Sequence, residues 1–172
     1  MRRTAVITGW HWTGFGHCLG VPRLSCCLAD LDEAGLSETF ELAASAAVRM
    51  SQYVLDVTDR EAVAAFPKVV KERHPKVHLL VNNAGVALGG TFEQVSDEDF
   101  EWLFEVNFWG IVRMTRAFLP LLRESDDARV VNMSSLFGLI APPGQAAYSA
   151  SKFAVRVFRR RCSMNLRERP LA

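Results

Sequence analysis

The stretch VHLLVNNAG, residues 77–85, shows the pattern that decides the fold. A short, largely apolar run passes abruptly into small and polar residues, as in a strand that is buried on both faces and ends at a ligand-binding edge. Four further runs of the chain share this form. The five predicted strands are Thr4–Thr8, Cys26–Asp30, Gln52–Asp56, Val77–Val81 and Arg129–Ser134.

Helical patterns separate these runs. They cover Glu33–Ala47, Asp59–His74, Asp97–Leu122 and Tyr148–Leu166. Two start signals support them, because the segment 58–61 fits a capping box opened by Thr58, and Ser96 precedes an acidic first turn. Strands that alternate with helices predict right-handed βαβ units. We therefore expect one α/β domain over residues 1–172, a Rossmann-like doubly wound parallel sheet with helices on both faces.

Composition excludes several classes of function. The chain has 172 residues, 49% of them hydrophobic, and a net charge of +1, so a general polyanion binder is not expected. No apolar run reaches the roughly 18 residues of a membrane span. The adjacent Cys26 and Cys27 are expected to fill the core in a reducing compartment, and no metal site is predicted because no His or Cys cluster has zinc-ligand spacing. We expect a cytoplasmic protein that binds neither nucleic acid nor membrane.

Tyr148 and Lys152 are the first candidate catalytic pair. They are four residues apart, so they share a face of the last predicted helix. An ammonium group beside a phenol favours the phenolate, which makes tyrosine a usable general acid/base. Ser135 follows the fifth predicted strand, where its hydroxyl could hold a substrate oxygen. The alternative for this pair alone is a solvated helix face with no catalytic role.

Asn107 adds an independent signal. It falls on the apolar stripe of the predicted helix Asp97–Leu122, between Phe104 and Ile111. A buried amide must find hydrogen-bond partners or cost stability. The residue is therefore a site candidate, with a satisfied structural asparagine as the alternative.

Several motifs together resemble the short-chain dehydrogenase/reductase family. They are NNAG at 82–85, VNFWG at 106–110, VVNMSS at 130–135 and YSASK at 148–152, with LADLD at 28–32 and LDVTD at 55–59 in support. The thirteen-residue step from Ser135 to Tyr148 matches the family's serine–tyrosine spacing and selects Ser135 over Ser134. The resemblance covers almost the whole chain.

The resemblance implies a role for each site residue. Tyr148 would exchange a proton with the substrate oxygen while a hydride moves to or from nicotinamide, and Lys152 would assist it and bind the nicotinamide ribose. Ser135 would orient the substrate, a secondary alcohol or ketone, and Asn107 would hold a water in a proton relay. The cofactor-binding residues would be Thr8, Gly9, Gly14, Gly16, Asp30, Asp56, Asn83, Ala84, Gly85, Tyr148 and Lys152, and the family also implies a homodimer or homotetramer through the two long helices.

Asp30 bears on the choice of cofactor. A carboxylate at the end of the second strand can accept hydrogen bonds from the adenosine ribose diol and would repel a 2′-phosphate. The sequence places no arginine beside it or in the glycine turn. NAD is therefore favoured over NADP.

Residues 10–27 depart from the family pattern. The turn that begins at Thr8 carries four residues, not three, between Gly9 and Gly14, and two of them are tryptophans. Gly20 and Pro22 then fall where the first helix is expected, although both residues disfavour a helix interior. We hypothesise a local reading-frame or splicing disruption, or a sequencing error, that re-enters frame near Leu28.

The end of the sequence is the second departure. The family continues with two more strands after the helix that carries Tyr148, and the sequence stops in that helix. The expectation is an incomplete sheet with an apolar edge. The alternative function is therefore an impaired truncated isoform or pseudogene-like product that acts by pairing with a full-length relative. Nucleic-acid binding through the arginines at 156 and 159–161 is disfavoured, because these residues fit a solvated helix face.

Overall fold

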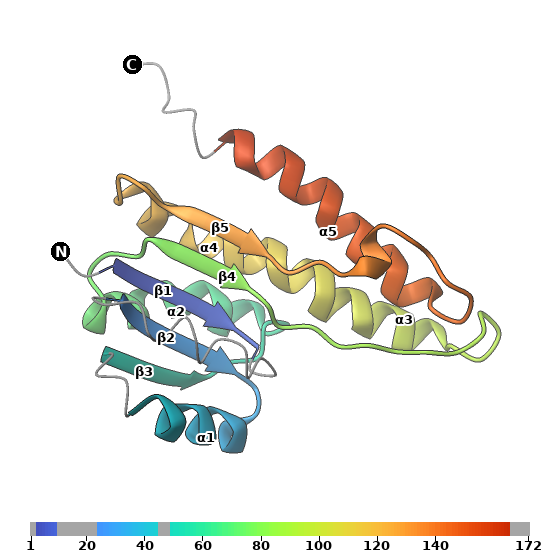
Figure 1. The fold of residues 1–172 in the computed structure, drawn as a ribbon, viewed down its shortest axis with the longest axis horizontal. Coiled ribbons are helices and arrows are strands. Elements are labelled where there is room, and N and C mark those ends of the chain that lie inside the picture. Colours follow the sequence, from blue (N-terminus) through green and yellow to red (C-terminus); the bar gives the residue numbers. More distant parts are fainter. Residues whose placement is uncertain (1–2, 10–23, 45–48, 166–172) are drawn as a thin grey trace.

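A five-stranded parallel sheet forms the centre of the molecule. The computed structural model describes residues 3–9, 24–44 and 49–165. The strands run in the order β3-β2-β1-β4-β5 (Figure 1). This confirms the predicted open parallel sheet, whose strands are β1 (Arg3–Thr8), β2 (Leu24–Asp30), β3 (Arg49–Val54), β4 (Leu79–Asn82) and β5 (Arg129–Asn132).

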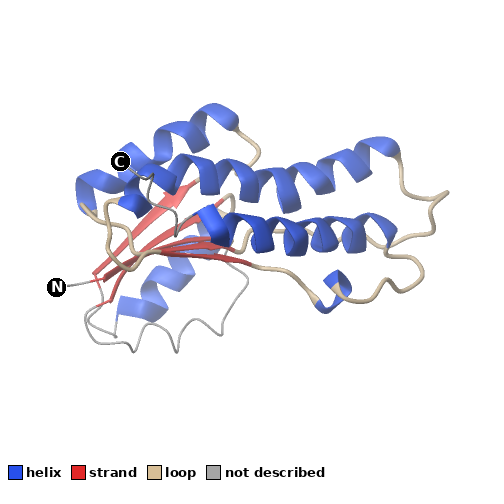
Figure 2. Cartoon of the chain, turned by 90° about the horizontal axis from the view of Figure 1, so that it is seen from above, coloured by secondary structure: helices blue, strands red, loops and turns tan. Residues whose placement is uncertain are grey.

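Helices cover both faces of this sheet, as predicted (Figure 2). Helix α1 (Glu33–Ala44) lies on one face, and the other helices lie on the opposite face. That second group consists of α2 (Arg60–Arg73), α3 (Asp97–Phe104), the π-helical turn η2 (Glu105–Trp109), α4 (Gly110–Arg123) and α5 (Ala146–Asn165), while a short 3-10 turn, η3 (Leu136–Gly138), follows β5. The doubly wound arrangement thus holds for the described part of the chain.

The two core clusters explain why the central strands consist mostly of apolar residues. Along β1, Val6 packs into the large cluster with Phe66 of α2 and Phe118 of α4, whereas Ala5 and Ile7 join a smaller cluster on the other face. Both sides of the strand are therefore withdrawn from water, and each large side chain buried in this way contributes about 1.5–3 kcal/mol.

The boundary of β3 differs from the prediction. It spans Arg49–Val54, not 52–56, so Asp56 lies in the loop beyond the strand. The Asp56 carboxylate accepts hydrogen bonds from the backbone N–H and the hydroxyl of Thr58, at 2.7 and 2.8 Å. Thr58 is thereby committed to a turn, and Asp59 caps α2 in its place by accepting from two backbone N–H groups. The predicted capping box at Thr58 is therefore wrong by one residue, whereas the Ser96 cap of α3 is confirmed.

The predicted helix Asp97–Leu122 is not one regular helix. The π-helical turn η2 interrupts it between α3 and α4. Asn107 lies within this turn and is fully buried. Such wide turns are frequent at functional sites, because one extra residue re-aims the side chains of the turn.

Part of the atypical segment fits the sheet. Leu24 to Cys27 belong to β2 and pair in register with Arg3 to Val6 of β1. Cys26 and Cys27 are buried, as expected, and burial raises the pKa of the Cys27 thiol to about 12. The rest of the segment, including the expected first helix, Gly14 and Gly16, lies outside the described residues.

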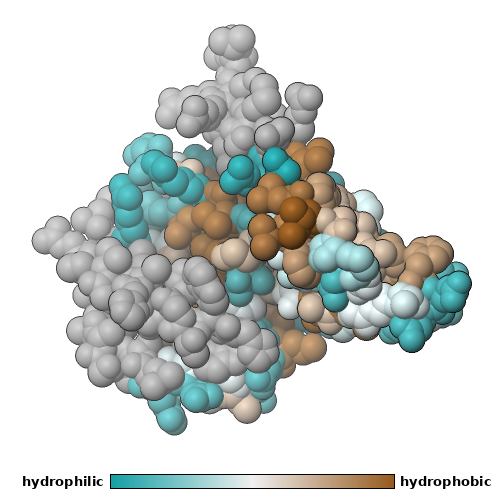
Figure 3. All heavy atoms as spheres, turned by 45° about the vertical axis from the view of Figure 1, so that its right-hand side comes forward, coloured by the Kyte–Doolittle hydropathy of each residue, from teal (hydrophilic) through white to brown (hydrophobic). Residues whose placement is uncertain are grey.

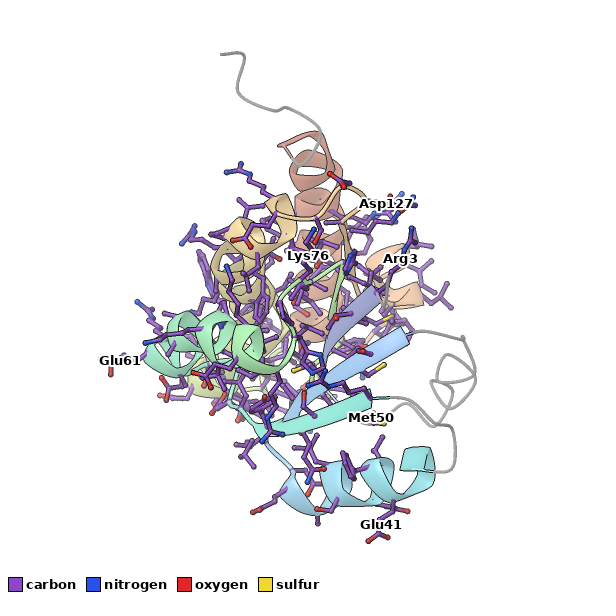
Figure 4. All side chains as sticks on the ribbon, turned by 90° about the vertical axis from the view of Figure 1, so that its left-hand side faces the viewer. Arg3, Glu41, Met50, Glu61, Lys76 and Asp127 are labelled. Carbon is purple, nitrogen blue, oxygen red and sulfur yellow. The ribbon has the colours of Figure 1, made fainter. Side chains whose placement is uncertain are left out.

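The surface of the described chain shows two contrasting regions. Apolar side chains gather on one face in Figure 3, and the exposed large apolar side chains include Val131 of the edge strand β5 and Leu136 and Leu139 after it. The amino-terminal edge of the sheet, viewed in Figure 4, is instead charged, and Arg3 pairs there with Asp127 at 3.2 Å. None of the described helices is long and apolar enough to cross a membrane.

Candidate functional site

A pocket of about 610 Å³ opens at the carboxyl ends of the strands. The chain reverses its direction of sheet growth between the neighbours β1 and β4, and ligands of open α/β sheets bind at such a switch point. The pocket is lined by Gly9, Ala29, Asp30, Leu31, Asp32, Leu55, Asp56, Val57, Thr58, Asn83, Ala84, Gly85, Val86, Ala87, Trp102, Val106, Met133, Ser134, Tyr148 and Lys152. Eight of the sequence-predicted site residues therefore share one cavity.

The turn after β1 is locked to the turn after β4. Gly9 has a φ of +80°, and a Cβ there would lie 2.5 Å from the backbone of Ala84. Asn83 Nδ2 donates to the Gly9 carbonyl at 2.8 Å, and the backbone N–H of Ala84 donates to Thr8 Oγ1 at 3.3 Å. Thr8 is thus buried behind the pocket wall, where it joins the two turns. A glycine is required at position 9 by both its conformation and this close approach.

The two predicted carboxylates, Asp30 and Asp56, lie at one end of the pocket, and Asp32 also lines it. Asp30 Oδ1 accepts from the backbone N–H of Asp32 at 2.9 Å, and Asp56 uses its Oδ1 to hold the Thr58 turn. In the described chain, no donor is placed against the Oδ2 of either residue. Each carboxylate is therefore fixed by one oxygen and keeps the other for a ligand.

Tyr148 and Lys152 lie at the other end, both on α5. Lys152 Nζ is 5.5 Å from the centre of the Tyr148 ring. Lys152 is only 4% exposed, and burial lowers the pKa of its ammonium from the ordinary value. Within the described residues its Nζ donates one long hydrogen bond, 3.4 Å to the carbonyl of Met133. An ammonium has three donors, so two hydrogens of a buried cation face the pocket without a protein acceptor there.

Asn107 connects helix η2 to the loop after β4. Its Oδ1 accepts from the backbone N–H of Val86 at 2.8 Å, and its Nδ2 donates to the Val86 carbonyl at 2.9 Å and to Ser151 Oγ at 3.2 Å. Gly85 lies between Asn107 and Lys152, because a Cβ on it would be 3.1 Å from Asn107 Oδ1 and 3.2 Å from Lys152 Nζ. Asn107 therefore supports the pocket from behind its wall.

The two serines after β5 face different partners. Ser135 Oγ accepts from the backbone N–H of Phe137 at 3.2 Å and caps η3. Ser134 Oγ donates to the Lys152 carbonyl at 3.1 Å, although Ser134 and not Ser135 is in the pocket lining. Phe137 in turn packs edge-on against the Tyr148 ring, with 5.9 Å between centroids. Ser135 therefore lies two residues before Phe137, whose ring contacts Tyr148.

Sequence reasoning missed four contributors to this site. Val86 acts through its backbone and Met133 through its carbonyl, so neither carries a signal in its side chain. Ser151 lies within the YSASK motif, one residue before Lys152, and its contact with Asn107 could have been suspected from that position. Trp102 also lines the pocket, but an aromatic residue within a predicted helix rich in apolar residues gives no separate sign of a site.

The residues present fit a dinucleotide. At one end of the pocket, the Oδ2 atoms of Asp30 and Asp56 could accept hydrogen bonds from a ribose diol. At the other end, the buried Lys152 ammonium could donate hydrogen bonds to an oxygen of a second ribose or of a phosphate. The tight approach of Gly9 and the lack of a Cβ at Gly85 leave backbone exposed to the cavity between those ends. Its volume falls in the range of about 300–1,000 Å³ that is usual for small-molecule sites.

Sheet order and pocket position together define a Rossmann-like α/β protein. Comparison with known proteins gives the family. The family model described as short chain dehydrogenase matches residues 4–171. The SadH protein of Mycobacterium tuberculosis is 44% identical over 160 residues, which cover 91% of this chain, and the oxidoreductase YusZ of Bacillus subtilis is 36% identical over 162 residues. The chain therefore belongs to the short-chain dehydrogenase family of oxidoreductases.

Solved structures agree with this assignment. A short-chain dehydrogenase/reductase from Burkholderia phymatum, crystallised with NAD, superposes with a TM-score of 0.87 at 34% identity over 96% of this chain. An NAD⁺-bound xylitol dehydrogenase gives a TM-score of 0.89 at 25% identity. The chain spans 58% of the length of SadH and 60% of the Burkholderia protein.

Proposed function

We propose that the pocket binds NAD and that the chain supplies the proton-transfer residues for exchange between a secondary alcohol and a ketone. The observation that carries the proposal is one cavity that has Tyr148 and Lys152 at one end and Asp30 at the other, with Gly9 between them. When bound, NAD supplies the hydride acceptor or donor, and the protein supplies alignment and proton transfer.

Tyr148 is proposed as the general acid/base. Its phenolic oxygen would give a proton to the carbonyl oxygen in reduction and take the hydroxyl proton in oxidation. Lys152 Nζ lies 5.5 Å from the centre of the Tyr148 ring, so the proposal places a cation beside the group that exchanges this proton. The ring packs edge-on against Phe137, with 5.9 Å between the centroids, and this contact would help to orient the hydroxyl toward the substrate.

The other three residues are proposed to position the reactants. Lys152 would donate its two uncommitted hydrogens to the nicotinamide ribose. Ser135 would donate its hydroxyl proton to the substrate oxygen, since the bond from Phe137 uses only a lone pair of Oγ. Asn107 would hold a water through the second lone pair of Oδ1, the first being occupied by Val86. Together these contacts would complete a proton path from Tyr148 to solvent.

Asp30 supports NAD over NADP. It lines the pocket with a free Oδ2, and a 2′-phosphate beside it would meet a negative charge. Lys152 is the only cation in the described lining and lies at the Tyr148 end, so no described side chain would neutralise that phosphate. We expect NADP to bind at least about tenfold more weakly than NAD, a difference of about 1.4 kcal/mol.

The two tyrosines of the chain provide the test of the chemistry. Tyr148→Phe should leave NAD affinity within a factor of two, roughly, and abolish NADH formation with a panel of secondary alcohols. Tyr53→Phe is the matched control, because Tyr53 packs edge-on against Phe66 in the core and its hydroxyl has no partner among the described residues. Equal rates for wild type and Tyr148→Phe would overturn the role given to Tyr148. No NAD binding by a folded wild-type chain would favour the impaired-isoform alternative.

We also propose that two copies associate through the exposed sides of α4 and α5. Trp109, directly before α4, and Val157 of α5 are 46% and 64% exposed, and the proposal is that these apolar side chains pack against a second copy. Sedimentation velocity should show a dimer or tetramer that Val157→Asp dissociates. A monomer at all concentrations would contradict the proposal.

A further inference from the structure

Trp102 is a pocket residue that the proposed mechanism does not use. It lies on α3 and is 48% exposed, yet it lines the cavity. Trp109, seven residues further along, is almost equally exposed at 46% but packs edge-on against Phe108, 5.4 Å away, and is not part of the lining. No ring–ring contact is found for Trp102 in the described chain. Its indole is thus presented to the cavity without an aromatic partner.

The neighbours of Trp102 indicate which end of the pocket it faces. Val106, four residues later, also lines the cavity. One further turn along, a Cβ on Gly110 would lie 2.9 Å from Val57 Cγ2, so this side of the helix packs toward the loop that carries Asp56. Trp102 therefore belongs to the wall shared with the two carboxylates and not to the end that holds the Lys152 ammonium.

The aromatic side chains of the lining indicate which group of the ligand would fit against this wall. Tyr148 and Trp102 are the two aromatic side chains of the described lining, and Tyr148 is committed to the nicotinamide end. A half-exposed indole offers a flat apolar face, and planar heteroaromatic bases stack on such faces without needing hydrogen bonds. In NAD the group that would reach the carboxylate end is the adenine.

We propose that Trp102 is a cofactor-positioning residue that forms one wall of the adenine subsite, with the indole stacked on the adenine ring. The inference rests on the proposed NAD site and specifies which side chain contacts the adenine end of the cofactor. It assigns no part in hydride or proton transfer to Trp102. Its effect should therefore appear in binding of the adenosine half and not in the turnover of bound reactants.

Fragments of the cofactor separate the two ends. Isothermal titration calorimetry is performed with NAD, ADP-ribose and nicotinamide mononucleotide on wild type, Trp102→Leu and the matched control Trp109→Leu. A stacking contact at a half-exposed site is worth about 1 kcal/mol, so Trp102→Leu should weaken NAD and ADP-ribose binding about fivefold and leave the mononucleotide unchanged. Trp109→Leu should leave all three affinities within about a factor of two, and Trp102→Tyr, which keeps an aromatic face, should recover most of the loss.

The outcomes distinguish this inference from the proposed function. A wild-type chain that binds neither NAD nor ADP-ribose refutes the NAD site and the inference with it. A wild-type chain that binds NAD, with Trp102→Leu binding ADP-ribose equally well, refutes the stacking role alone. Equal losses for ADP-ribose and the mononucleotide would place Trp102 elsewhere and also overturn the proposal. If Trp102→Leu does not fold, as judged by circular dichroism, ADP-ribose affinity is compared between Trp102→Tyr and Trp102→Gln. Tighter binding by Trp102→Tyr would support the stacking role, and equal affinities would refute it.

Discussion

Replacing Asn107 by alanine tests the link between fold and site. The side chain is fully buried and makes three hydrogen bonds, two of them to both backbone groups of Val86. Alanine removes all three and leaves the Val86 N–H and carbonyl without this partner. At about 1 kcal/mol for each bond, the loss is about 3 kcal/mol. The higher helix propensity of alanine returns about 0.5 kcal/mol, so the net expected loss of unfolding free energy is about 2–3 kcal/mol.

Urea unfolding followed by circular dichroism measures this loss. Glu101→Ala is the matched control, because Glu101 lies exposed on the same helical run, and it should change the unfolding free energy by less than about 0.5 kcal/mol. NAD affinity should fall in Asn107→Ala as well, since the loop after Gly85 loses its anchor. An unfolding free energy equal to that of wild type would show that Asn107 does not hold the loop and would refute this reasoning.

Three further predictions follow from single contacts. Gly9→Ala should lower the unfolding free energy by about 1–3 kcal/mol in the same urea assay, because alanine is strained at φ +80° and its Cβ would meet Ala84 at 2.5 Å; an unchanged midpoint would contradict the tight turn. Gly85→Ala should weaken NAD binding several-fold by calorimetry and also lower the unfolding free energy, because its Cβ would lie 3.1 Å from Asn107 Oδ1, which Val86 holds in place, and 3.2 Å from Lys152 Nζ; unaltered affinity would count against that placement. Burial, and after it the charges of Arg49 and Arg73, lower the pKa of His74 below 6.5 in the folded state. The unfolded chain therefore binds this proton more readily than the folded chain, so the unfolding free energy should be constant above about pH 7 and should fall as the pH drops through about 6.5. His74→Gln should make this fall shallower, with a remainder from His78, whose pKa burial also lowers, and an equally steep fall in that variant would assign the effect to other groups.

The sheet and the pocket could be predicted because each depends on local patterns. A strand buried on both faces needs a largely apolar run, and a ligand edge needs small or polar residues directly after it; residues 77–85 show both. Tyr148 and Lys152 share a helical face through spacing alone. The predicted helix between 97 and 122 likewise placed Asn107 among buried residues, which the structure confirms.

Other features depend on contacts that no local pattern encodes. The π-helical turn at Glu105–Trp109 accompanies a side chain bonded to the distant backbone of Val86, and backbone groups carry no signal in the sequence. The cap of α2 moved to Asp59 because the Asp56 carboxylate competes for Thr58. The proposed role of Trp102 could be inferred only once the structure had placed α3 beside the cavity. The reading-frame explanation of residues 10–27 stays a hypothesis, because residues 10–23, with Gly14 and Gly16, lie outside the described residues.

A crystal structure of the chain grown with saturating NAD tests the central claim most directly. The account predicts continuous density through the pocket at the carboxyl ends of the strands. The adenosine ribose should contact Asp30, and the nicotinamide ribose should contact Lys152 beside Tyr148. NAD bound at another surface, or a pocket that stays free of NAD although the sheet is intact, would contradict the account.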